Sequence, residues 1–248
     1  MILFLKLLLA HLLGDFVLQP ESWVKEKELK KYRSPKLYLH VLIHFILMVI
    51  FTRDISLLPV ILIISVSHLL IDILKVGFQN EHNRRTLFFV DQVLHLLVLV
   101  ITVIIILPQS IIIGQKEINY ILILFTAILF LLSPSSIIIK TILSKWTPDA
   151  RINNQEMETS SLLNAGKMIG YLERLLVFIF ILNVQWAAIG FLVTAKSVFR
   201  FGDLKMGRDR KLTEYILIGT LLSFGMAILV GTTVEKMILE QMQKYFGD

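Results

Sequence analysis

Long uninterrupted apolar runs constrain this chain more than any other feature. Residues 118–139, for example, contain no charged side chain. A helix needs about 20 apolar residues to cross roughly 30 Å of hydrocarbon, and only helices or closed barrels satisfy their backbone groups there. Because the runs lack the two-residue alternation of barrel strands, we predict an all-α fold, a polytopic bundle of transmembrane helices.

The apolar runs predict about eight spans. They lie near residues 2–18, 37–51, 57–76, 87–107, 118–139, 167–182, 186–199 and 213–234. Lys and Arg residues gather in alternate loops, whereas the loops between hold only Arg53 and Lys116. Because positive charge marks cytoplasmic loops, we expect both termini outside and a multi-pass protein in the lipid bilayer of a bacterial inner membrane.

Charge and composition exclude several function classes. The net charge of +6 follows from the basic cytoplasmic loops, so we expect no nucleic-acid partner. The chain has no cysteine, which excludes disulfides, thiolate metal sites and a cysteine nucleophile. P-loop, Rossmann and Gly-x-Ser-x-Gly signatures are absent, which argues against nucleotide hydrolysis and serine esterase chemistry.

The two halves of the chain differ in character, since no histidine follows His95. We therefore predict a four-helix transmembrane domain over residues 1–110. A second group of transmembrane helices is expected over residues 111–248, with a polar cytoplasmic loop near 144–166.

Five of the six histidines fall into one repeating pattern. Each of the first four predicted spans carries two ionisable side chains four residues apart: His11 and Asp15, His40 and His44, His68 and Asp72, Asp91 and His95. This spacing puts both members of a pair on one helix face. Every pair also lies about 3–12 Å inside the predicted cytoplasmic boundary, at 1.5 Å per residue. The four faces are therefore expected to meet in one buried cluster.

Imidazole and carboxylate groups without thiolate suit a divalent metal, zinc above all, with manganese or iron(II) as alternatives. All eight side chains of the four pairs are predicted ligands, and Gln92 is expected to add hydrogen bonds. Eight groups exceed the needs of one zinc, so either two metals bind or several groups orient the ligands. A metal-free His–Asp network or a proton relay is the alternative interpretation.

Three sequence stretches resemble the signatures of a known family. They are His11-Leu-Leu-Gly-Asp15-Phe-Val-Leu-Gln19, His68-Leu-Leu-Ile-Asp72-Ile-Leu-Lys75 and Phe89-Val-Asp91-Gln92-Val-Leu-His95. The family is the domain-of-unknown-function 3307 group of bacterial membrane proteins, and the resemblance covers residues 1–107. It implies a membrane protein but no reaction. The paired motifs are also similar in style to inner-membrane proteins predicted to be metal-dependent hydrolases.

The second half carries three candidate partner residues on otherwise apolar predicted spans. Glu173 and Arg174 are adjacent and so do not face each other on a helix. Glu173 is expected either to pair with Lys196 or to act as a general base. The stretch that holds these residues resembles a C-terminal extension of some members of the family.

Three functions are compatible with the cluster. The first is a metal-dependent hydrolase that cleaves a lipid-like or membrane-associated ester or phosphoester at the cytoplasmic leaflet. Asp15, Asp72 and Asp91 are then the candidate catalytic proton acceptors. The second is a transporter or channel for a divalent metal or protons. The third is a non-enzymatic membrane regulator with a structural metal.

Overall fold

The chain forms an all-α structure, as predicted. The computed structural model describes residues 2–106, 120–146, 156–204 and 210–246, with side chains at 2–106, 120–146, 166–198 and 214–240. Its helices are α1 (Ile2–Phe16), α2 (Glu21–Lys30), α3 (Pro35–Thr52), α4 (Leu58–Phe78), α5 (Arg84–Ile106), α6 (Tyr120–Leu143), α7 (Glu156–Leu182), α8 (Trp186–Leu204) and α9 (Arg210–Phe246). The described residues contain no strand.

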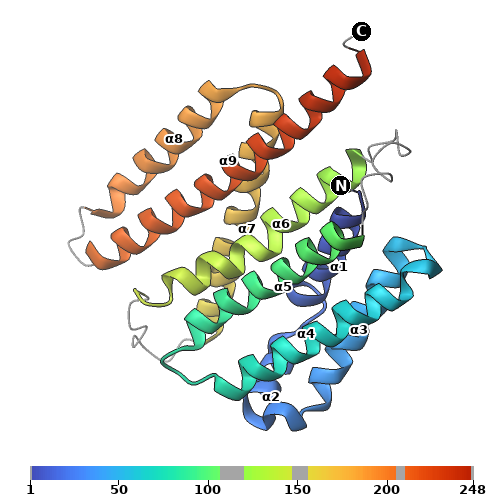
Figure 1. Ribbon diagram of the computed structural model, residues 1–248. Helices are drawn as coiled ribbons and strands as arrows, with labels where there is room; N and C mark the ends of the chain where they lie inside the picture. Colours follow the sequence, from blue (N-terminus) through green and yellow to red (C-terminus); the bar gives the residue numbers. More distant parts are fainter. Residues whose placement is uncertain (1, 107–119, 147–155, 205–209, 247–248) are drawn as a thin grey trace. The chain divides into compact units, whose positions relative to one another are not determined.

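The chain divides into two compact units, Met1–Thr126 and Ala127–Asp248. In the first unit α1 packs against α3 and α5, α3 packs against α4, and α4 packs against α5. Because each of the helices α1, α3, α4 and α5 (Figure 1) contacts two of the others, the four form a closed ring. In the second unit α7 packs mainly against α9 and also against α8. The predicted loop near 144–166 falls partly on residues 147–155, which lie outside the described residues, and Glu156 already begins α7.

The prediction of eight spans exceeds the five or six candidate spans among the described helices. Five are long and apolar enough to cross a membrane: Pro35–Thr52, Ile55–Phe78, Arg84–Ile106, Tyr120–Leu143 and Glu214–Glu240. Helix α1 has only 15 residues and becomes a sixth candidate only together with Glu21–Arg33, across a bend of 78°. The two remaining predicted spans do not qualify among the described residues: α7 carries three charged residues over 167–182, and the described part of α8 with side chains, Trp186–Val198, is too short.

Apolar side chains fill one end of the four-helix ring. Six buried residues form this apolar layer: Leu7, Ala10, Met48, Ile61, Ile64 and Leu99. Along every helix the layer lies on the same side of the His/Asp pairs, since it precedes them on α1 and α4 and follows them on α3 and α5. The apolar layer therefore closes the bundle on one side of the cluster.

The other end of the ring is covered by α2, which the sequence predicted only as part of a loop. Glu28 on α2 accepts a hydrogen bond from Gln79 Nε2 at 2.8 Å and pairs with Arg84 Nη2 at 2.9 Å. Lys31 donates to the carbonyl of Gln79 at 3.1 Å. These contacts hold the polar helix α2 against the ends of α4 and α5.

Candidate metal centre

The four helices of the ring each contribute one pair to a single buried cluster, which we call the centre. It comprises His11 and Asp15 from α1, His40 and His44 from α3, His68 and Asp72 from α4, and Asp91 and His95 from α5. The side chain of Asp15 is 9% exposed and the other seven residues are at most 4% exposed. The structure thus brings together all eight of the residues that the i, i+4 spacing selects.

Asp15 lies in the middle of the centre. Its Oδ1 atom is 3.0 Å from His44 Nε2, 3.1 Å from His40 Nε2 and 3.8 Å from His68 Nε2. Its Oδ2 atom accepts a hydrogen bond from Gln92 Nε2 at 2.8 Å and lies 3.8 Å from His11 Nε2. The two carboxylate oxygens therefore face different histidines.

Asp15, His40, His44 and His68 form what we call the primary ligand set. Besides the distances from Asp15, the Nε2 atoms of His40 and His68 are 3.2 Å apart. Zinc bound tetrahedrally at 2.0–2.1 Å keeps its ligand atoms about 3.3 Å apart. The measured separations bracket this value, so these buried groups could hold a metal ion.

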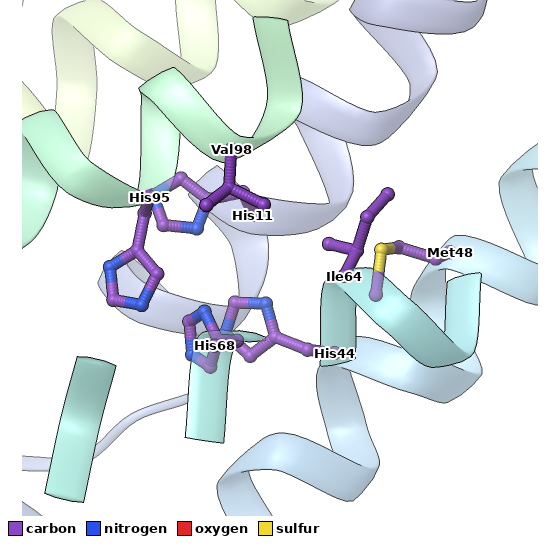
Figure 2. Close-up of a pocket in the computed structure, with 7 residues that line it drawn as sticks. All are labelled: His11, His44, Met48, Ile64, His68, His95 and Val98. Atoms are coloured by element: carbon purple, nitrogen blue, oxygen red, sulfur yellow. The ribbon is translucent and has the colours of Figure 1, made fainter. Parts of the chain in front are cut away.

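A second group of polar atoms lacks partners. Among the described residues, five buried side-chain atoms have no hydrogen-bond partner, and four of them belong to His11, Asp91 and His95. The imidazoles of His11 and His95 border a small cavity of about 10 Å³ together with those of His44 and His68 (Figure 2). Such a cavity has room for about one water molecule.

Two lysines reach into the centre, Lys27 from the predicted loop between the first two spans and Lys75 from the end of the third span. Lys27 Nζ on α2 is 3.1 Å from Asp72 Oδ2, and both side chains are buried. Lys75 Nζ is 2.7 Å from Asp91 Oδ2. Lys75 could have been found, because it follows Asp72 by three residues and so shares its helix face. Nothing in the polar segment around Lys27 distinguishes it from its neighbouring lysines.

Gly14 lets α1 and α3 approach each other at the centre. A Cβ atom built on Gly14 would lie less than 3.0 Å from three atoms of the His44 ring. Contacts this short do not occur between real side chains, so the missing side chain allows His44 to reach Asp15. The sequence analysis did not single out Gly14. Its position next to Asp15 in an apolar helix is the one local feature that could have drawn attention to it.

Replacing Gly14 with alanine is therefore expected to displace His44. We expect divalent-metal affinity to fall by about 10–100-fold, the effect of disturbing the groups that orient a ligand. The helix itself gains, since alanine is the better helix former. Competition with a fluorescent chelator measures the change. Gly77→Ala on α4, where nothing lies within 4 Å of the new Cβ, is the control, and equal affinity in the two variants would contradict the prediction.

The other predicted partner residues lie in the second unit. Lys196 Nζ on α8 donates to Glu173 Oε2 on α7 at 2.5 Å. Arg174 is only 4% exposed and donates to the carbonyl of Leu131 at 2.6 Å, to Ser136 Oγ at 2.6 Å and to Ser223 Oγ at 3.0 Å. Arg174 therefore links α7 to α6 and α9.

Arg174→Ala is expected to destabilise the second unit by about 3 kcal/mol, because it removes three charge-assisted hydrogen bonds and leaves a cavity. Thermal unfolding in detergent measures this loss. The control is Lys167→Ala, an exposed cation on the same helix. Equal melting temperatures for the two variants would rule out the linking role of Arg174.

Comparisons with known proteins give one family match, over the part of the chain that contains the centre. The family model described as a protein of unknown function (DUF3307) matches residues 3–123, which include all four helices of the ring. No curated protein and no solved structure matches the chain. Through residues 3–123, the part that contains the centre, this chain belongs to the DUF3307 family.

Proposed function

We propose that the protein is a membrane-embedded, zinc-dependent hydrolase of a bacterial inner membrane. Its substrate would be a lipid-like ester or phosphoester that enters from the cytoplasmic leaflet. One observation carries this proposal: the primary ligand set adjoins a cavity with room for one water molecule. A catalytic zinc ion keeps a position for water, so an ion held by all four groups of the primary ligand set would take this water as a fifth ligand.

A divalent metal bound here would supply Lewis acidity and favour ionisation of water near neutral pH. Asp15, His40, His44 and His68 would hold it. The imidazoles of His11 and His95 border the cavity in which this water would lie. Gln92 donates to both Asp15 Oδ2, at 2.8 Å, and Asp91 Oδ2, at 3.2 Å, and so would fix both carboxylates.

Among the three candidate proton acceptors, Asp91 is the best placed. Asp15 contributes to the ligand set, and Oδ2 of Asp72 is held by Lys27. Asp91 also pairs with a lysine through Oδ2, but its Oδ1 atom is buried without a hydrogen-bond partner. A general base must present a free acceptor atom to the proton that it removes. We therefore assign this role to Asp91 Oδ1.

The two ends of the ring favour hydrolysis over transport. A transporter needs a polar path from the centre to each face of the membrane, and the apolar layer of Leu7, Met48, Ile61 and Leu99 with its neighbours fills one end. The end covered by the lysine-rich helix α2 is, by the distribution of positive charge, the cytoplasmic one. The polar groups thus lie between the apolar layer and α2, so a substrate would have to approach them from the end that α2 covers.

The test uses the full chain, purified without chelator and reconstituted in liposomes. We expect bound zinc by elemental analysis and turnover of a lipid phosphoester or acyl ester. Asp91→Asn should keep its zinc and lose at least about 100-fold in turnover, the usual effect of removing a general base. Glu81→Gln, at an exposed carboxylate, is the control. Zinc accumulation inside the liposomes, or full turnover by metal-free protein, would defeat the proposal.

A further inference from the structure

Four of the five unpartnered atoms of the centre belong to residues outside the primary ligand set. They are His11 Nε2, Asp91 Oδ1 and both ring nitrogens of His95. The primary ligand set contributes only one such atom, His40 Nδ1. Buried polar groups are normally hydrogen-bonded, and those that are not often indicate an ion or water. A binding position on the side of His11 and His95 would account for these atoms.

The side chains around His11 and His95 have the chemistry of a metal site. His11, His95 and Asp15 each offer one ligand atom, and these three atoms lie within 4.8 Å of one another. The imidazole centroids of His11 and His95 are 5.3 Å apart, and both rings border the cavity (Figure 2). We call these residues the second ligand set.

A carboxylate also lies near the other ring nitrogen of His95, without a hydrogen bond to it. Its Nδ1 atom faces Asp91 Oδ1 at 3.7 Å, which leaves Nε2 available for a cation. Histidines that bind metals commonly direct their second ring nitrogen towards a carboxylate, which fixes the orientation of the ring. Asp91 is in turn held by Lys75 and Gln92.

Asp15 belongs to both ligand sets through different oxygens. Oδ1 faces His40, His44 and His68, whereas Oδ2 faces His11. A carboxylate with one oxygen towards each set can bridge two ions about 3.5–4 Å apart, as in two-metal hydrolytic sites. We propose that the centre is dinuclear, with a second divalent cation held by His11, His95 and Asp15 Oδ2. This inference rests on the proposed function for the first ion.

A second ion also indicates the class of substrate. Asp15, Asp72 and Asp91 with Lys27 and Lys75 leave a formal charge of −1 when the imidazoles are neutral. One divalent ion changes this charge to +1 and two change it to +3. Excess positive charge in a water-poor site is stabilised by an anion. The dinuclear centre therefore selects a phosphoester over an uncharged acyl ester.

The experiment counts manganese ions on the full chain in detergent, by equilibrium dialysis and elemental analysis. We expect two ions per wild-type chain and one in the double variant His11→Ala, His95→Ala. His82→Ala, which removes an exposed histidine outside the centre, should keep both. Electron paramagnetic resonance of the wild type should show two magnetically coupled ions.

The possible failures are distinguishable. One ion in the wild type, unchanged in the His11, His95 double variant, overturns the dinuclear centre and leaves the proposed function intact. Two ions without magnetic coupling overturn the shared carboxylate of Asp15. No bound ion in the wild type overturns both the inference and the proposed function.

Discussion

Asp15→Ala should leave the purified protein without its metal. Among the described residues, Asp15 is the carboxylate that lies within 3.8 Å of ring nitrogens from His11, His40, His44 and His68. Its loss removes a ligand oxygen from both ligand sets and the negative charge nearest to the imidazoles. Disturbing a partner of a ligand already costs about 10–100-fold in affinity, so we expect a loss of at least about 100-fold.

Elemental analysis of Asp15→Ala after purification in zinc-containing buffer measures this effect, and turnover should fall in parallel. The control is Asp54→Asn, an exposed carboxylate between α3 and α4, which should keep its metal. Size-exclusion chromatography checks that both variants remain folded. Full metal content in Asp15→Ala would contradict the central role of this residue in the centre.

The helices and the meeting of the eight side chains could be predicted from local rules. Apolar runs define helices in a membrane because the backbone has no other way to satisfy its hydrogen bonds. Two side chains four residues apart share a face in any α-helix, so the pairs on α1, α3, α4 and α5 needed only a common depth to meet. That these groups bind metal stays a prediction.

Features that depend on tertiary structure could not be predicted. Lys27 and its neighbours in the segment 20–36 look alike in sequence, and only the bend of 78° between α1 and the segment Glu21–Arg33 places Lys27 beside Asp72. Gly14 matters because of a ring on another helix, His44. The number of spans was overestimated because hydropathy alone weighed neither the charges of α7 nor the short length of α1.

Lys27→Met is expected to destabilise the first unit by about 3–5 kcal/mol, the usual effect of removing one partner of a buried ion pair. The variant leaves the carboxylate of Asp72, which is 3% exposed, without its cation. Lys25→Met, at an exposed position on the same helix, is the matched control and should not change the stability. Thermal unfolding in detergent compares the two.

The double variant Lys27→Met, Asp72→Leu separates the ion pair from the packing of α2. If the loss of stability in Lys27→Met comes from an unpaired buried charge, removing that charge as well should restore much of the stability. Apolar replacements of buried ion pairs often leave the stability unchanged. If it comes from lost packing, the double variant should be at least as unstable as the single one. Equal melting temperatures for Lys27→Met and Lys25→Met would show that the pair between Lys27 and Asp72 does not hold α2 over the centre.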